Sequence, residues 1–298
     1  MGRLLNTILI GVSGGSIYSL MALALVLVWR STRVVNFAQA GQAILSTYIG
    51  YVVITHTNNY WIAFPVALLA GALAGALIDI LMVRTLMKRA HSGPVAGIAP
   101  VIATLGLLGL IRAVVGMIWG GDLRQFKLPV SNHGFTFGHN TIPFAPINLL
   151  IVMTTVVVML IFSLIFQRTN LGLSLRASAY QPEIARLAGI RVDLTRTIGW
   201  AFAGAAGAVA GMLVTPTNYL SPNSLDLLLV SGFVAAVIGG LESLVGAAVG
   251  GLILGISLAL VLEYISSSLA FPVAFVVLIA VLLFKPSGLI GAKRTRHA

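Results

Sequence analysis

The stretch RTNLGLSLRASAYQPEIARLAGIRVDLTR, residues 168–196, is an island of charge in a chain that otherwise avoids charge. The segments on either side of it, 146–166 and 197–215, are apolar and have about the 20 residues that a helix needs to cross the hydrocarbon core of a bilayer. Between them lie five arginines, opposed by only Glu183 and Asp193. This pattern predicts a long, basic and largely helical loop, presented to a partner, between two membrane spans.

Composition supports a membrane protein over the whole length. The chain has 298 residues, of which 58% are hydrophobic and 8% are charged. Soluble domains carry about 25% charged residues, so a soluble fold is excluded. The apolar runs are continuous and do not alternate, which favours helices over a membrane barrel. Cysteine is absent, which excludes disulfides and thiolate metal sites. We therefore expect an all-α polytopic integral membrane protein.

The apolar runs predict eight or nine spans, and the basic residues between them indicate their orientation. Cytoplasmic loops of membrane proteins are enriched in Lys and Arg. If there are nine spans, one side of the membrane holds all the basic clusters, the 168–196 loop and a 285–298 tail. This side is the cytoplasm, so the C-terminus is expected there. We attribute the net charge of +11 to this bias and not to nucleic-acid binding. We expect a single domain over 1–298, with spans near 4–29, 34–55, 61–83, 97–119, 146–166, 197–215, 227–241, 246–264 and 270–284.

Several spans carry glycine pairs at four-residue spacing. Small residues at this spacing let helix backbones approach closely in a membrane. We interpret the pairs as packing surfaces; they are Gly71 and Gly75, Gly207 and Gly211, Gly246 and Gly250, and Gly251 and Gly255.

The second predicted span carries a polar face that suggests a translocation path. On a helical wheel its polar residues fall within about 140° of arc. Amides in hydrocarbon are costly unless they find partners, so this face should meet other helices or water. Gly41 could break the helix, and transporters bind substrates at broken helices. The alternative is hydrogen bonding that only holds the helices together. The residues of this face are Asn36, Gln39, Gln42, Ser46 and Thr47.

The first and third spans carry weaker polar signals. Asn6, Ser13 and Ser16 lie roughly on one face of the first span and are candidates either for the path or for packing. Asp79 lies near the inner end of the third span, where we expect Arg84 to neutralise it. No carboxylate sits convincingly at the midplane, as a proton or sodium relay would require.

The sequence lacks the motifs of an enzyme. It contains no G-x-x-x-x-G-K-[ST] phosphate loop, because GLIGAKR at 288–294 has neither the spacing nor the hydroxyl residue. It also contains no HExxH, no GxSxG and no cysteine nucleophile. We therefore expect no catalytic site, no bound cofactor and no metal in this chain.

Five stretches together resemble one family, the permease subunits of branched-chain amino-acid ABC importers, and within it the first (H-type) of the two permeases of the leucine-isoleucine-valine system. The likeness covers nearly the whole chain. The stretches are GVSGGSIYSLMALALVLVWRSTRVVNFAQAG at 11–41, TLGLLGLIRAVVGMIWG at 104–120, GLSLRASAYQPEIARLAGIRV at 172–192, GGLESLVGAAVGGLILG at 239–255 and FKPSGLIG at 284–291.

The resemblance implies an ABC importer permease fold in the bacterial cytoplasmic (inner) membrane, and it implies partners. Two ATP-binding subunits that hold ATP and Mg²⁺ would bind the cytoplasmic face. A second permease, a heterodimer in preference to a homodimer, would complete the path, and an external binding protein would deliver substrate. The family's second-span motif maps onto Asn36, Phe37, Ala38 and Gly41, and its coupling segment maps onto Arg176, Ala177, Glu183, Ala185, Leu187, Gly189 and Ile190.

The chain departs from the family pattern at two places. Gln39 stands where the family commonly has His or a similar residue, and Gln181-Pro182-Glu183 stands where it tends to have Asp or Asn. The second departure lies in the coupling segment and changes the contacts expected there.

The residues of the coupling segment independently predict a short helix at 182–188. Pro182 suits the first turn, Glu183 favours the positive N-terminal end, and Gly189 is a natural stop. Such a helix would carry Ile184, Leu187 and Ala188 on one side and Arg186 on another. So short a helix is marginal alone, so we expect a partner groove to hold it. The alternative is a solvated helix whose arginines meet anionic lipid.

Three functions remain to be weighed from the sequence. The leading hypothesis is the permease of a binding-protein-dependent ABC importer for branched-chain or related amino acids. The alternative is an ion-coupled secondary transporter of small neutral or zwitterionic solutes, and an intramembrane enzyme is the third. Similar permeases serve other amino acids, amides and urea, so the sequence leaves the substrate open within that range.

Overall fold

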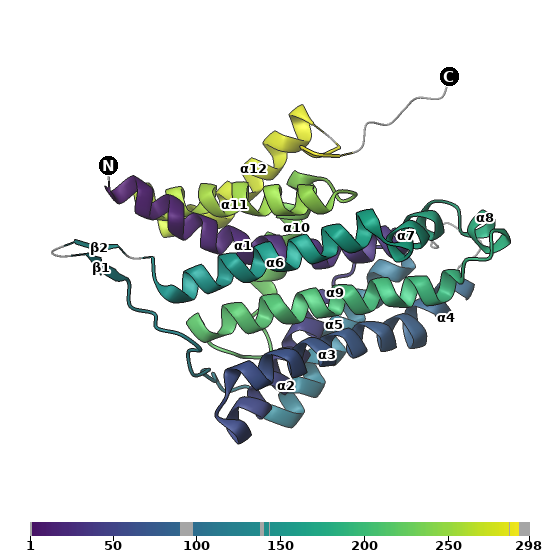
Figure 1. Cartoon of the computed structure of the whole chain (residues 1–298), viewed down its shortest axis with the longest axis horizontal. Helices are drawn as coiled ribbons and strands as arrows, with labels where there is room; N and C mark the ends of the chain where they lie inside the picture. The colour runs from purple at the N-terminus through teal and green to yellow at the C-terminus, as the bar shows by residue number, and fades with distance from the viewer. Residues whose placement is uncertain (1, 90–97, 138–139, 143, 286, 292–298) are drawn as a thin grey trace. The chain divides into compact units, whose positions relative to one another are not determined.

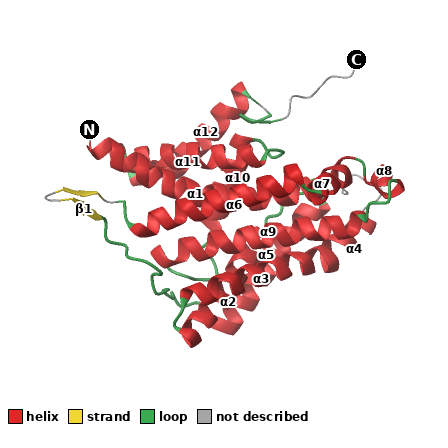
Figure 2. Cartoon of the chain, in the orientation of Figure 1, coloured by secondary structure: helices red, strands yellow, loops and turns green. Residues whose placement is uncertain are grey.

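The structure is a computed structural model that describes the chain except for residues 1, 90–97, 138–139, 143, 286 and 292–298. The described part is almost entirely helical, as Figure 2 shows. Its two strands, β1 (Phe135–Phe137) and β2 (Asn140–Ile142), form a small antiparallel hairpin. Most of the expected 285–298 tail, including Lys293, Arg294 and Arg296, lies outside the described residues.

Each of the nine segments expected to span a membrane contains a helix. The fold is therefore all-α, as predicted. The helices are α1 (Gly2–Thr32), α2 (Gln39–Thr57), α3 (Tyr60–Ile78) continued by a π-helical turn η1 (Asp79–Val83) and α4 (Arg84–Arg89), α5 (Ala99–Trp119), α6 (Pro146–Arg168), α7 (Asn170–Tyr180), α8 (Pro182–Leu187), α9 (Val192–Val214) with a 3₁₀ turn η2 (Thr215–Thr217), α10 (Asp226–Gly239), α11 (Leu244–Tyr264), a 3₁₀ turn η3 (Ser267–Leu269) and α12 (Ala270–Phe284).

Within the described residues, six helices are long and apolar enough to cross a membrane. They are Arg3–Thr32, Tyr60–Leu86, Ala99–Trp119, Pro146–Arg168, Val192–Thr217 and Leu244–Tyr264. The other three expected segments fall outside this set. Of these, α10 and α12 are short apolar helices, whereas α2 has 19 residues and carries two glutamines.

The chain divides into two compact units. Unit 1 consists of Met1–Val26, Val130–Leu160 and Val230–Ala298, and unit 2 consists of Leu27–Pro129 and Ile161–Leu229. The boundaries fall inside α1, α6 and α10, so these helices contribute residues to both units. The expected single domain stays a prediction.

Unit 2 is built around α2, α3 and α9, which lie side by side (Figure 1). The two glycines of α3, Gly71 and Gly75, lie directly against the α9 backbone. A Cβ atom added to Gly71 would stand 2.5 Å from the carbonyl oxygen of Gly204, and one added to Gly75 would overlap the carbonyl of Trp200. We call this contact the α3–α9 seam, and it confirms the packing role predicted for the glycine pair.

Unit 1 contains a similar close contact between α1 and α11. Gly15 of α1 lies against the backbones of Gly251 and Gly255. Beside it, the Ser19 hydroxyl donates a hydrogen bond to the carbonyl oxygen of Ala248 at 2.9 Å. The glycines predicted at 251 and 255 therefore also pack helix against helix.

Candidate substrate path and coupling site

The polar face of α2 begins with a turn and not with a helix. Arg33 has a left-handed φ of 58°, and α2 begins at Gln39. Asn36 precedes it, accepting a hydrogen bond from the Ala38 amide at 3.0 Å and donating one to Gln39 Oε1 at 3.1 Å. Our placement of Asn36 on a helical wheel was therefore wrong, because the Asn side chain competes for backbone groups and holds a turn. Gly41 lies in the first turn of α2, so the break comes before it.

Most of the face is satisfied by hydrogen bonds within unit 2. The Gln39 amide donates to the carbonyl oxygen of Ala203 on α9 at 2.9 Å. The hydroxyls of Ser46 and Thr47 donate to the carbonyl of Ala43 on their own helix, at 2.9 and 2.6 Å. All five residues of the predicted face are fully buried, at 0% exposure. The Gln39 bond ties α2 to α9, and the bonds of Ser46 and Thr47 satisfy their hydroxyls within α2.

Gln42 differs from the rest of the face. Its side chain is fully buried, and neither its Nε2 nor its Oε1 has a hydrogen-bond partner among the described residues. Leaving a buried polar group unsatisfied costs about 1–3 kcal/mol. Gln42 therefore has an amide donor and an amide acceptor that are both unused among the described residues, unlike the other residues of the face.

The weaker candidates on α1 belong to unit 1. Asn6 is half-buried. The Ser13 hydroxyl donates to Asn148 Oδ1 on α6 at 3.0 Å, and the Ser16 hydroxyl donates to the Val12 carbonyl at 2.7 Å. Both serines thus have partners typical of packed membrane helices.

The coupling segment contains the predicted short helix. α8 has Pro182 at its first position and Glu183 in its first turn, and it ends one residue earlier than the predicted 188. Gly189 follows with a φ of +82°, a left-handed conformation that suits glycine and ends the helix. Glu183 and Arg186 form an ion pair at 2.7 Å on the exposed side. The prediction of this helix, its first turn and its stop is confirmed.

The two large apolar side chains of α8 point away from the chain. Ile184 is 57% exposed and Leu187 is 89% exposed, although both stand in a charged loop between spans. Ala185 is buried and faces inward, so it holds α8 in place and is not available to a partner. Arg176 of α7 is exposed, with its Nε donating to the Gly172 carbonyl at 3.3 Å. The outward side of α8 therefore carries two exposed apolar side chains next to charged ones.

The basic loop is shorter than predicted at its C-terminal end. α9 begins at Val192, so Arg196 lies in a helix and is buried. Its Nε donates to Asp79 Oδ1 at 2.7 Å, and Arg84 stands 3.7 Å from the other oxygen of the same carboxylate. The sequence indicated Arg84 as a partner of Asp79 and missed Arg196. The sequence did show an arginine just inside an apolar helix, which indicates a buried ion pair. The partner of that arginine depends on which helices pack together, so the sequence did not identify it.

A cleft of about 220 Å³ separates α8 from this buried ion pair. Its walls come from the end of α1, from α7, α8 and α9, and from Arg84. The side chains of Glu183 and Arg186 line one side, and those of Asp193 and Arg196 line another.

These features define an integral membrane permease with an exposed helix between its spans, and comparison with known proteins agrees. Residues 7–284 match the family model described as "Branched-chain amino acid transport system / permease component", so the chain belongs to this family.

Similar proteins carry related names. The chain is 34% identical over 247 residues to "Probable branched-chain amino acid transport permease protein LivH" of Methanocaldococcus jannaschii, covering 79% of this chain and 75% of that protein. It is 28% identical to the "High-affinity branched-chain amino acid transport system permease protein BraD" of Pseudomonas aeruginosa, over 94% of each chain. It is 29% identical to the similarly named LivH of Escherichia coli, over 94% of this chain and 93% of that protein. No solved structure matches the chain.

Proposed function

We propose that this chain is a permease subunit of a binding-protein-dependent ABC importer for branched-chain or related amino acids. ATP hydrolysis in partner subunits drives the transport, and the chain itself catalyses no reaction. The observation that carries the proposal is the exposed apolar pair Ile184 and Leu187 on α8, in a chain whose family is a transport-system permease component.

The coupling step follows from the construction of α8. A helix of six residues is too short to be stable alone, and here it is held by the Gly189 turn and by the buried Ala185. Its outward side offers Ile184 and Leu187 as apolar anchors, with Arg176, Glu183 and Arg186 around them. A groove on an ATP-binding subunit that receives these side chains would move α8 when it opens and closes.

The transported solute would meet the amide of Gln42. Because this amide is neutral and lies in an apolar helix bundle, it suits the polar ends of a neutral or zwitterionic molecule and does not select for net charge. In unit 2, the residues of the α2 face that already have hydrogen-bond partners shape the helices beside Gln42; they are Asn36, Gln39, Ser46 and Thr47. In unit 1, the α1 residues Asn6, Ser13 and Ser16 are separate candidates for the path. Alternating access then requires helix movement, since the α2 face is fully buried here.

The proposed assembly has two ATP-binding subunits on the cytoplasmic face, a second and different permease, and an external binding protein. The chain crosses the bacterial cytoplasmic membrane several times, with its C-terminus in the cytoplasm. The names of the relatives support the amino-acid substrate class, since they are called branched-chain amino acid transport permeases.

The first test is purification of the tagged chain from its native membrane in mild detergent, followed by identification of the proteins that accompany it. We expect stoichiometric ATP-binding subunits and a second permease. The complex, reconstituted with its binding protein, should import leucine in a reaction that vanadate blocks. A chain that purifies alone and whose transport collapses with an ionophore, but not with vanadate, would support the ion-coupled alternative.

A further inference from the structure

Asp79 is a buried carboxylate inside an apolar segment. It is 0% exposed and lies within Tyr60–Leu86, a segment long and apolar enough to span a membrane. Its Oδ1 accepts a hydrogen bond from Arg196 Nε at 2.7 Å, and its Oδ2 accepts one from the Thr197 hydroxyl at 2.6 Å. Charged groups are costly to bury in such segments, so an ionisable residue there is a candidate for a functional role.

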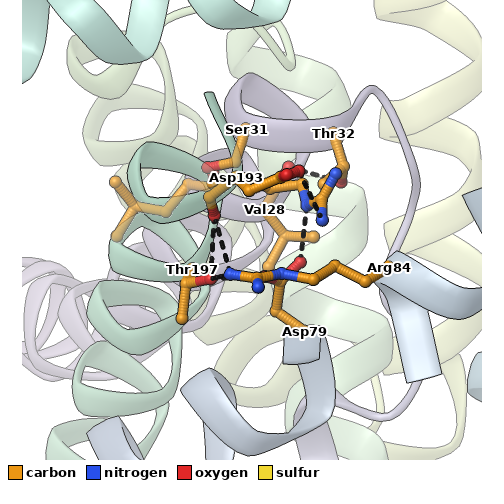
Figure 3. Close-up of polar contacts among 9 residues, drawn as sticks. Val28, Ser31, Thr32, Asp79, Arg84, Asp193 and Thr197 are labelled. Atoms are coloured by element: carbon orange, nitrogen blue, oxygen red, sulfur yellow. Dashed lines mark hydrogen bonds and ion pairs between the residues drawn. The ribbon is translucent and has the colours of Figure 1, made fainter. Parts of the chain in front are cut away.

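Arg84 completes the network around this carboxylate, which Figure 3 shows between α3 and α9. Its Nη2 donates to Thr197 Oγ1 at 2.8 Å and to the Asp193 carbonyl oxygen at 3.2 Å. Arg196 also pairs with the Asp193 carboxylate at 3.4 Å. We call these residues, Asp79, Arg84, Asp193, Arg196 and Thr197, the Asp79 clamp. The clamp joins the first turns of α9 to the far end of α3.

Asp79 opens a turn of π-helix, Asp79–Val83, between α3 and α4. Such turns are rare, and they are frequently found at functional sites. The clamp thus grips α3 where its backbone is least regular. A force on α9 there can move α3 without first breaking a regular helix.

α8 is connected to the clamp through a short, hydrogen-bonded turn. The Gly189 amide donates to the Arg186 carbonyl and the Ile190 amide donates to the Ala185 carbonyl, both at 3.0 Å. α9 then begins at Val192, so Asp193 and Arg196 stand only one turn beyond the connection. The cleft lies between α8 and the clamp, so the contact from α8 to α9 in this region runs through the turn.

Farther along α9, the contacts lead to the proposed substrate path. The α3–α9 seam holds the two backbones together, and Ala203 of α9 receives the Gln39 amide of α2. The middle of α9 is rich in Gly and Ala, and these small side chains let α2 and α3 pack closely against it. A shift of the first turns of α9 would therefore reach α2 and α3 through these contacts.

We propose that Asp79 is a positioning residue for coupling: it locks α3 to α9 so that a movement of α8 shifts α2, α3 and α9 together. The inference rests on the proposed function, because it needs an ATP-binding partner that moves α8. It assigns a mechanical role to a carboxylate that touches neither substrate nor nucleotide. A purely structural Asp79 would neutralise the arginines and hold the fold, without affecting how hydrolysis is converted to transport.

The test compares Asp79→Asn with wild type in the complete complex in proteoliposomes, measuring leucine uptake and ATP hydrolysis in the same vesicles. We expect uptake to fall by about tenfold while hydrolysis per folded complex stays within about twofold, because the coupling between α9 and α3 is lost. Glu263→Gln is the matched control, since Glu263 forms an exposed ion pair with Arg3 outside the clamp. It should leave both rates unchanged.

Two further variants keep the test decisive if Asp79→Asn folds poorly. Thr197→Val keeps the buried charge pair and removes one hydrogen bond to Asp79. It should therefore raise the ATP consumed per leucine imported by a smaller factor than Asp79→Asn does. Asp79→Asn combined with Arg196→Gln removes both charges, and its ATP per leucine should match that of Asp79→Asn, because the two residues act as one unit.

Parallel loss of uptake and hydrolysis in every clamp variant, at constant ATP per leucine, would overturn the proposal in favour of a structural role. Wild-type coupling in Asp79→Asn would overturn it as well. Failure of the proposed function looks different, because the wild-type complex itself would then show no ATP-dependent uptake.

Discussion

The α3–α9 seam and the α8 helix lie in the same unit but are stabilised in opposite ways. In the seam, glycines let two backbones touch, and the neighbouring polar side chains find their partners inside the chain. In α8, six residues present Ile184 and Leu187 outward, where nothing in the described part of the chain covers them. The seam is complete within one chain, whereas α8 leaves two apolar side chains exposed, which we propose that a partner protein covers. Substitutions in the two regions should therefore fail differently.

The largest effect is expected in the seam. Gly204→Leu would drive a side chain into the backbone of α3 at Gly71, and overpacking of this kind costs about 1–3 kcal/mol or more. We expect little folded protein and a lowered midpoint in thermal unfolding followed by size-exclusion chromatography. Gly109→Leu on α5 is the matched control, because a Cβ there meets nothing within 4 Å. Equal tolerance of both variants would contradict the close packing of the seam.

The next largest effect is expected on α8, without loss of folding. Replacing Ile184 and Leu187 together with Ser removes two apolar anchors, each worth about 1.5–3 kcal/mol when fully buried. The variant should fold as wild type but bring down at least about tenfold less ATP-binding subunit on purification. Ile184→Val with Leu187→Met keeps the apolar surface and should keep the partner. Undiminished co-purification of the Ser variant would show that α8 is not the docking surface.

Substitutions of the two glutamines of α2 should affect stability and transport differently. Gln39→Leu should destabilise the chain by about 1–3 kcal/mol, since it leaves the Ala203 carbonyl and the Asn36 amide without their bonds. Gln42→Leu removes an amide that has no hydrogen-bond partner in the described part of the chain, so stability should hold or rise while uptake falls. Thermal unfolding and uptake measured on both variants test this contrast. Normal uptake by Gln42→Leu would remove Gln42 from the path.

The smallest effect on stability is expected at the exposed Glu183–Arg186 pair. Ion pairs at such exposed positions contribute only about 0–1 kcal/mol, so the double Ala variant should insert and fold normally. We still expect it to uncouple hydrolysis from transport, because both side chains stand beside the apolar anchors of α8. Parallel uptake and hydrolysis assays check this. Wild-type uptake per ATP would remove the two residues from the coupling surface.

Local patterns in the sequence were sufficient where the chemistry is local. Long apolar runs predicted every helix of the membrane region, and Pro182 with Gly189 predicted both ends of α8 to within one residue. Local reasoning failed at Asn36, because a side-chain hydrogen bond to the backbone turned the chain before α2 could start. It also failed at Arg196, whose identity as a buried partner of Asp79 depends on a residue 117 positions away.

The sequence alone therefore determined the class of protein, the presence of a helix in each apolar run, the family and the short helix between spans, because burial in lipid and helix ends depend on neighbouring residues. Only the tertiary structure decided that Gln39 is satisfied while Gln42 is not, that Ala185 faces inward while Leu187 faces outward, and that Asp79 binds two arginines. Hydrogen bonds and ion pairs require both partners at a few ångströms, and that distance is set by which helices pack together, which no local pattern encodes.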